Sequence, residues 1–233
     1  MENPRSAAIW VAVLFIIATA ASVAGEIMLG PLRLAGNYDL SEIAENPQKV
    51  VSAFLMFLFA CSAIVAIPIV LFPILRLHSE TGALIYVAAR FAEGLLFLFG
   101  GIFTLALIPL AFATTEKGDV FAVIDELSLY SYTLGTMVVF GFSAIVLAVL
   151  FYQTRLVPRW LSVWKGIGAV LLVAQGVLVL YDSITPLMEQ ILYLPIAVNE
   201  MVLALWLIVK GFSPEALIAL RSKADLESAG RKT

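Results

Sequence analysis

The chain is poor in the residues on which most catalytic and metal-binding sites depend. Its 233 residues contain one cysteine, Cys61, and one histidine, His78. Cys61 lies inside a long apolar run, where a lone cysteine behaves as a small hydrophobic residue, so no disulfide framework follows from it. His78 lies in a short polar stretch and has neither a cysteine nor a second histidine near it. We therefore expect no metal site and no cofactor.

Charged residues are also scarce. They make up 13% of the chain, whereas apolar residues make up 62%; soluble domains contain about 25% and about 45–50%. Apolar runs of about 20 residues are the signature of transmembrane helices. The composition indicates a polytopic helical membrane protein, whose expected partners are membrane lipids. It contains no basic patch of the kind that binds nucleic acid, so nucleic acid is not an expected partner.

Motifs that mark an active site are missing as well. The chain contains no phosphate-binding glycine loop, no Ser/His/Asp set and no HExxH pattern. A membrane-embedded enzyme acting on lipid would need a nucleophile or a set of metal ligands. The question of catalysis stays open at this point, and the sequence weighs against it.

Six apolar stretches predict an all-α, polytopic transmembrane bundle. The expected spans are residues 7–29, 50–75, 83–113, 127–152, 161–181 and 186–211, followed by a short cytoplasmic tail over 213–233. Asn46-Pro47 and Thr185-Pro186 each place a capping side chain before a proline at the first helical position. The sequence predicts a short surface helix at 39–45 in the first loop and a long loop at 114–126.

The first span also has features of a secretory signal. Ser22-Val23-Ala24 resembles a signal-peptidase site that follows an apolar core. The apolar run is long for a signal, however, and Arg5 is the only basic residue before it. We therefore expect an uncleaved first helix.

The distribution of Lys and Arg predicts the orientation. Placing both termini on one side of the membrane groups ten of these residues there: Arg5, Arg76, Arg155, Arg159, Lys165, Lys210, Arg221, Lys223, Arg231 and Lys232. The opposite side receives three, Arg33, Lys49 and Lys117. Cytoplasmic loops are enriched in Lys and Arg, so both termini are predicted to be cytoplasmic.

Three charged residues, Arg90, Glu93 and Glu200, lie inside predicted spans. Each charge at the centre of a membrane helix costs about 2.5–3.5 kcal/mol on insertion scales. At a rise of 1.5 Å per residue, Arg90 lies roughly 10 Å deep and both glutamates lie roughly 15 Å deep, so all three are close to one level. Arg90 and Glu93 share a helix face. With Asn199 beside Glu200, they form a candidate site near the bilayer midplane.

Other polar residues in the spans are weaker candidates. Gln175 is expected to make an interhelical hydrogen bond more often than to line a pathway. Glu26 falls near the outer end of its helix, where water can reach it. Lys165 is expected to extend its ammonium group to the inner membrane surface.

Two interpretations of the buried charges are open. An Arg90–Glu200 bridge would fix the packing of two helices. Alternatively, the charges form a site for an ion, a proton or a small polar ligand, and the surplus of two carboxylates over one guanidinium favours this view. The leading hypothesis is a protein that binds a small ligand, ion or lipid. The alternatives are a small proton-coupled carrier, which six spans without visible inverted repeats favour less unless the protein forms a homo-oligomer, and a structural or regulatory subunit whose buried ion pair only fixes helix packing.

Several short motifs together resemble a known family. They are Asn3-Pro4-Arg5, Arg90-Phe91-Ala92-Glu93, Leu156-Val157-Pro158-Arg159-Trp160-Leu161, and Glu200 followed by Leu205-Trp206-Leu207-Ile208-Val209-Lys210-Gly211. The chain resembles the bacterial family catalogued as domain of unknown function 4386. The resemblance implies a multi-pass protein of the bacterial cytoplasmic membrane. It supplies no substrate, cofactor or catalytic residue.

Overall fold

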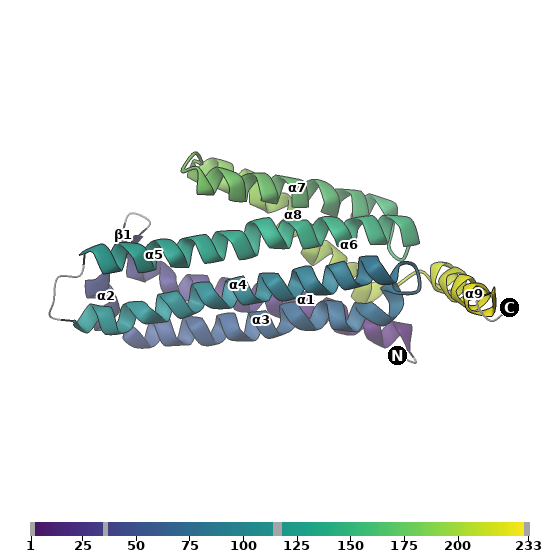
Figure 1. The fold of residues 1–233 in the computed structure, drawn as a ribbon, viewed down its shortest axis with the longest axis horizontal. Coiled ribbons are helices and arrows are strands. Elements are labelled where there is room, and N and C mark those ends of the chain that lie inside the picture. Colours follow the sequence, from purple (N-terminus) through teal and green to yellow (C-terminus); the bar gives the residue numbers. More distant parts are fainter. Residues whose placement is uncertain (1–2, 35–36, 114–117, 231–233) are drawn as a thin grey trace.

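Six long apolar helices form an elongated bundle in the computed structural model (Figure 1). The structure describes residues 3–34, 37–113 and 118–230. Within these residues, the candidate membrane spans are α1 (Pro4–Leu29), α3 (Pro47–Leu75), α4 (Glu80–Phe112), the continuous helix Gly118–Thr154, α7 (Arg159–Leu180) and α8 (Pro186–Val209). The predicted all-α class with six spans is therefore confirmed.

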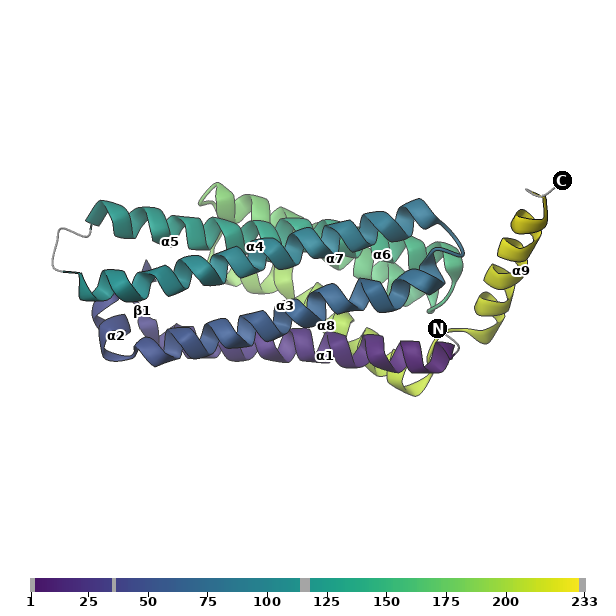
Figure 2. The same cartoon turned by 60° about the horizontal axis from the view of Figure 1, so that its bottom comes forward.

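Short elements connect or extend the spans. The connection from α1 to α3 contains a 3₁₀ turn η1 (Gly30–Leu32), the two-residue antiparallel strands β1 (Arg33–Leu34) and β2 (Asn37–Tyr38), and helix α2 (Leu40–Glu45). Helix α9 (Pro214–Gly230) follows the last span and lies across one end of the bundle (Figure 2), where Ala216 and Leu220 are buried. The predicted tail is thus helical as far as Gly230, and residues 231–233 lie outside the described part.

The fourth span is longer than its apolar stretch. Residues 127–152 were the predicted span and 114–126 a predicted loop, but a helix begins at Gly118 and runs to Thr154. It consists of α5 (Gly118–Thr133), a π-helical segment η2 (Leu134–Val139) and α6 (Phe140–Thr154). The loop prediction was wrong from residue 118 onwards: the acids Asp119, Asp125 and Glu126 suggested a loop, but they flank the apolar run 120–124 and the helix continues through all of them. Residues 114–117 lie outside the described part.

Helix starts follow capping chemistry except at α3 and α7, where no side chain caps the first turn. Asn3 caps α1, Ser79 accepts a hydrogen bond from the Gly82 backbone N–H at 3.0 Å, and Thr185 accepts one from Met188 at 3.4 Å. Asn46 was a predicted cap for α3, but its side chain makes no capping bond. Its amide instead donates to the carbonyl of Glu42 at 3.4 Å, so it belongs to the end of α2.

The spans form a ring in the order α1, α3, α4, α5–α6, α7 and α8, and α8 packs back against α1. This last contact is confined to the end that carries the termini. There Ala8, Val11 and Phe15 share a buried core with Leu203 and Leu207 of α8. Nearer the opposite end, no residue of α8 from 186 to 195 is buried, so the ring is open between α1 and α8.

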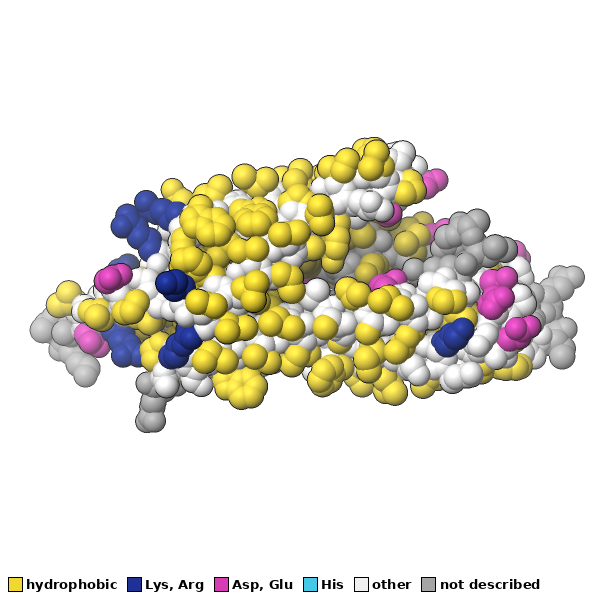
Figure 3. Space-filling view, turned by 180° about the vertical axis from the view of Figure 1, so that it is seen from behind, with side chains coloured by type: hydrophobic (Ala, Val, Ile, Leu, Met, Phe, Trp, Pro, Cys, Tyr) yellow, Lys and Arg dark blue, Asp and Glu magenta, His cyan; other side chains and the backbone are white. Residues whose placement is uncertain are grey.

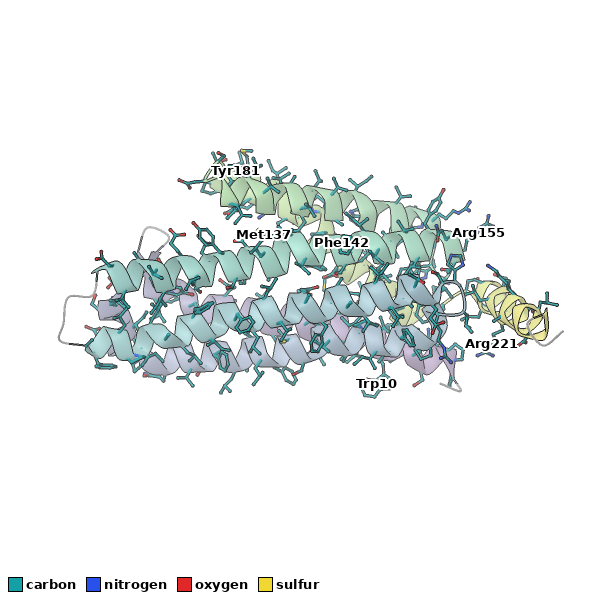
Figure 4. The ribbon with its side chains drawn as sticks, in the orientation of Figure 1. Trp10, Met137, Phe142, Arg155, Tyr181 and Arg221 are labelled. Carbon is teal, nitrogen blue, oxygen red and sulfur yellow. The ribbon has the colours of Figure 1, made fainter. Side chains whose placement is uncertain are left out.

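The two ends of the bundle differ in charge. Both termini lie at one end, which we call the termini end, and Lys and Arg side chains gather there (Figures 1 and 3). Figure 4 places Arg155 and Arg221 at this end and Tyr181, in the turn between α7 and α8, towards the opposite one. Asp and Glu side chains are more frequent at that opposite end (Figure 3). Lys117, Arg231 and Lys232, which entered the orientation argument, lie outside the described residues.

Candidate functional site

The first buried ion pair lies within a single helix. Arg90 and Glu93 of α4 are each 3% exposed, and the Arg90 Nη1 lies 3.1 Å from the Glu93 Oε2. Residues three apart on a helix are neighbours on one face, which explains why the pair forms locally. Because both partners belong to α4, this pair does not by itself join two helices.

Helix α6 completes the surroundings of this pair. The Ser143 hydroxyl donates to Glu93 Oε2 at 3.4 Å and to the Phe140 carbonyl at 2.8 Å. The Arg90 guanidinium lies 5.3 Å from the centre of the Phe140 ring, within cation–π range. Among the described residues, the Arg90 Nε has no hydrogen-bond partner. A buried polar group in this state is unusual and leaves one donor available to a ligand or water.

The second buried pair joins two helices and was not expected. Lys165 of α7 is 2% exposed, and its ammonium lies 3.2 Å from Glu200 Oε1 of α8 and 5.3 Å from the Phe15 ring. The prediction that Lys165 extends to the membrane surface was therefore wrong, and the Arg90–Glu200 bridge, one of the two interpretations left open, does not form. Without Lys165, nine basic residues remain on the predicted cytoplasmic side against three on the opposite side, so the predicted orientation is unchanged.

A periodic signal for the burial of Lys165 was present in the sequence. Leu161, Lys165, Gly168 and Leu172 recur at three- and four-residue intervals, and all four are buried on one face of α7. A lysine at such a position faces the bundle. The position of Lys165 near the start of its span gave the opposite impression.

A cavity of about 110 Å³ lies beside the two ion pairs, and we call it the central cavity. Arg90, Glu93 and Glu200 all line it, so the structure brings these three predicted site residues together. Its other lining residues come from α1, α3, α4, the fourth span and α8: Phe15, Ala18, Thr19, Ser22, Val23, Ile64, Phe97, Tyr132, Thr136, Met137, Phe140 and Tyr193. Val23 and Tyr193 are 48% and 46% exposed, which places the opening of the cavity between α1 and α8. The space-filling view shows the molecule hollowed on this face, with acidic side chains beside the hollow (Figure 3).

A second cavity of about 220 Å³ lies towards the end opposite the termini, and we call it the acidic vestibule. Four carboxylates line it: Glu26 of α1, Asp125 and Glu126 of α5, and Glu189 of α8. The two cavities share Phe97, Tyr132 and Met137 in their walls. The rings of Phe97 and Tyr132 pack with their centres 5.7 Å apart. These side chains therefore separate the vestibule from the central cavity.

The π-helical segment η2 lies where the fourth span meets the site. Thr136 and Met137 of η2 line the central cavity. A Cβ atom at Gly135 would lie 3.0 Å from the Phe97 nitrogen and 3.3 Å from the Glu93 carbonyl oxygen, so only glycine allows this close approach to α4. Single π-helical turns within α-helices occur frequently at functional sites.

Two predicted polar residues are buried outside the cavity walls. Asn199 donates from Nδ2 to the Leu161 carbonyl at 3.1 Å, which ties α8 to α7. Gln175 is buried in α7 at 3% exposure. In the described part of the chain, Asn199 Oδ1 and Gln175 Oε1 lack hydrogen-bond partners. Neither residue lines the two cavities, whereas the other secondary candidate, Glu26, lines the vestibule.

Metal binding receives no support from the described residues, which contain no group of three or more His, Cys, Asp or Glu side chains placed to hold an ion. The site instead offers paired charges, aromatic rings and hydroxyl groups around two small cavities. This arrangement is suited to noncovalent binding.

The fold and the site define a multi-pass integral membrane protein with two ion pairs buried among its helices. The chain belongs to the family described as Domain of unknown function (DUF4386), whose model matches residues 10–211. This confirms the resemblance seen in the sequence motifs. The matched region includes both ion pairs and ends before α9. No curated protein and no solved structure matches the chain.

Proposed function

We propose that this protein binds a small organic cation in the central cavity. The observation that carries the proposal is the charge of the cavity walls. Six carboxylates line the vestibule and the central cavity, whereas Arg90 is the one cationic side chain among their described lining residues. Even when Lys165 is counted behind Glu200, carboxylates outnumber cations.

The electrostatics and the aromatic content both favour a cation. A cleft lined by charges of one sign focuses the electric field and concentrates ligands of the opposite sign. Tyr38, Phe57 and Phe97 line the vestibule, and Tyr132 and Tyr193 face the central cavity. Aromatic faces attract cations, which is how many proteins bind ammonium groups.

The two ion pairs have different roles in this proposal. Lys165–Glu200 connects α7 to α8 and suits the structural interpretation of buried charge. Arg90–Glu93 lies within α4 and reaches α6 only through Ser143 and the Phe140 ring, yet it places two charges beside a cavity. Because insertion of such charges is costly, the pair is better explained by ligand binding. Glu93 accepts the cation, and Arg90 orients the Glu93 carboxylate.

The opening between α1 and α8 suggests an apolar part in the ligand. Val23 of α1, at the opening, is 48% exposed, and Ile27, one turn further along the same face of α1, is 70% exposed. A ligand with an ammonium head and a short alkyl chain could place its head at Glu93 and its chain along these residues. Such a ligand would reach the site from the lipid as well as from water.

The proposed location is the cytoplasmic membrane of a bacterium, with both termini in the cytoplasm. The basic termini end supports this orientation. The vestibule would then open away from the cytoplasm and sample ligands from outside the cell. A proton-coupled carrier is the alternative that the same site would serve, since Glu93 is a carboxylate at the cavity wall.

The test compares three probes of equal chain length. Octylammonium, octanol and octanoate are titrated against the protein in nanodiscs, and binding is measured by calorimetry. Octylammonium should bind and the other two should not. Loss of a charge-assisted hydrogen bond is worth about 1.5–3 kcal/mol, so Glu93→Gln should weaken octylammonium binding by about tenfold or more. Glu42→Gln, on the exposed surface of α2, is the matched control and should leave binding unchanged.

Two results would contradict the proposal. If octanoate binds and octylammonium does not, Arg90 selects an anion and the charge argument fails. If Glu93→Gln lowers stability but leaves octylammonium binding unchanged, the Arg90–Glu93 pair serves packing alone.

A further inference from the structure

A second charged cavity lies at the termini end, far from the acidic vestibule. It has a volume of about 530 Å³ and lies between the turn from α6 to α7 and the linker from α8 to α9. Residues 155–159 and 210–215 line it, together with Trp206 of α8. We call it the basic cavity.

The two chain segments that form the basic cavity are tied together. The Ser213 backbone N–H donates to the Leu156 carbonyl at 3.0 Å. The rings of Phe151 and Phe212 pack with their centres 6.4 Å apart. Leu156 and Phe212 are 0% and 5% exposed, so the cavity has a buried apolar floor. The cavity is thus a formed feature of the fold and not a gap between loose loops.

The rim of the basic cavity carries three cations against one carboxylate. The cations are Arg155, Arg159 and Lys210, and the carboxylate is Glu215, which accepts a hydrogen bond from Ser213 Oγ at 3.1 Å. Within the part of the chain that the structure describes, no carboxylate lies within salt-bridge distance of these three cations. Their hydrogen-bond donors are therefore available to an anion.

Arg159 is held in a geometry that suits recognition of an anion. Its guanidinium lies 4.8 Å from the centre of the Tyr152 ring. Stacking uses the face of a guanidinium and leaves the N–H groups at its edge available, and this planar fork matches the oxygens of a phosphate group.

Aromatic residues place this cavity at a membrane interface. Trp160 packs against Trp164 at 6.3 Å and against Trp206 at 6.4 Å between ring centres. Trp160 is 53% exposed although it lies within a membrane-spanning helix. Tryptophan clusters of this kind occur at the level of the lipid headgroups.

We propose that the basic cavity binds the phosphate headgroup of an anionic phospholipid. The three cations would contact the phosphodiester, and the acyl chains would pass over the tryptophan cluster into the bilayer. The apolar floor and the membrane-level tryptophans favour a lipid over free phosphate, which has no apolar part. This site is separate from the central cavity and stands independently of the cation-binding proposal.

The test uses the full-length, delipidated protein and native mass spectrometry. Phosphatidylglycerol and phosphatidylcholine with identical acyl chains are added, and the bound fraction of each is measured. The variant carries Arg155→Asn, Arg159→Gln and Lys210→Gln. Asparagine is chosen at 155 because the backbone there is left-handed, with φ of 56°. The control carries Lys49→Gln, Arg221→Gln and Lys223→Gln, which change the net charge equally outside the cavity.

Phosphatidylglycerol should bind in preference to phosphatidylcholine. One cation near an anionic headgroup is worth about fivefold in affinity, so the triple variant should lose about a hundredfold. The control variant should keep its affinity. If the triple variant fails to fold, Arg159→Gln and Lys210→Gln are tested singly, each with an expected loss of about fivefold.

Three results would overturn the proposal. Equal loss in the cavity variant and the control would mean that net charge alone attracts the lipid. Equal binding of the two lipids would mean that the anionic headgroup is not recognised. If inorganic phosphate raises the melting temperature as much as phosphatidylglycerol does, the ligand is free phosphate and the lipid assignment is wrong.

Discussion

Removing one member of the Lys165–Glu200 pair should destabilise the protein strongly. Breaking a buried pair leaves an uncompensated charge and costs about 3–5 kcal/mol, whereas removing both charges is often nearly neutral. The side chain of Lys165 is 2% exposed and that of Glu200 is 13% exposed. The carboxylate left by Lys165→Met can reach water in part, so we expect about 3 kcal/mol for that change.

The ammonium left by Glu200→Gln has no such access. We therefore expect Glu200→Gln to lie nearer the upper end of the range, at about 5 kcal/mol. The double variant Lys165→Met/Glu200→Gln should lose less stability than either single variant. The free energy of unfolding is measured by titration with sodium dodecyl sulfate in mixed micelles for the wild type, both single variants and the double variant.

A double-mutant cycle decides which cation pairs with Glu200. The coupling energy between Lys165 and Glu200 should be about 5 kcal/mol or more, because the two single losses together exceed the loss in the double variant by at least that much. The matched cycle replaces Arg90 with Gln and should give a weaker coupling to Glu200. If Arg90 couples to Glu200 more strongly than Lys165 does, the pairing described above is incorrect. If the single losses simply add in the Lys165 cycle, the contact contributes nothing.

Three further outcomes follow from the packing and the helix ends. Gly135→Ala should lower the melting temperature and weaken octylammonium binding, because a Cβ there meets the backbone of α4, whereas Gly118→Ala meets nothing within 4 Å and should do neither. Ser79→Ala should cost about 1 kcal/mol of unfolding free energy through loss of an N-cap, while Asn46→Ala, which removes no N-cap bond and only a long, exposed bond to the Glu42 carbonyl, should cost less. Arg5 donates to the carbonyls of Leu207 and Ile208 at the end of α8. Arg5→Gln should therefore increase hydrogen exchange in the last turn of α8, and unchanged exchange would exclude a capping role.

The two charged cavities give the protein opposite chemical characters at its two ends. The acidic vestibule lies away from the termini and the basic cavity lies beside them. If both proposals hold, the protein attracts cations on one side of the membrane and is anchored to anionic lipid on the other. The lipid site would then fix the position of α7 and α8, the two helices that the Lys165–Glu200 pair connects.

Hydropathy along the chain was sufficient to predict the spans. A membrane helix needs only a long enough apolar run, and this is a local property of the sequence. The same property identified Arg90, Glu93 and Glu200 as unusual, and the structure brings all three to the central cavity. The end of a helix is harder to predict: residues 118–126 contain three acids, Asp119, Asp125 and Glu126, around the apolar run 120–124, and they continue the fourth helix beyond the predicted span.

The partners of the buried charges were decided by the tertiary structure. Each residue turns a helix by about 100°, so the direction in which Lys165 points depends on the rotation of α7 and on which helix packs beside it. That rotation brings Lys165 to Glu200 and leaves Arg90 with Glu93. The sequence suggested two acids, Glu93 and Glu200, against one base, Arg90. In the structure Lys165 is a second buried base, so each acid has its own cation. The central cavity and the acidic vestibule likewise depend on tertiary structure, because α1 and α8 both line them and pack against each other only at the termini end. The sequence by itself determined the six spans and the charged residues inside them, because both depend on local composition. Which charges pair and where the cavities open depend on how the helices are rotated and packed against one another.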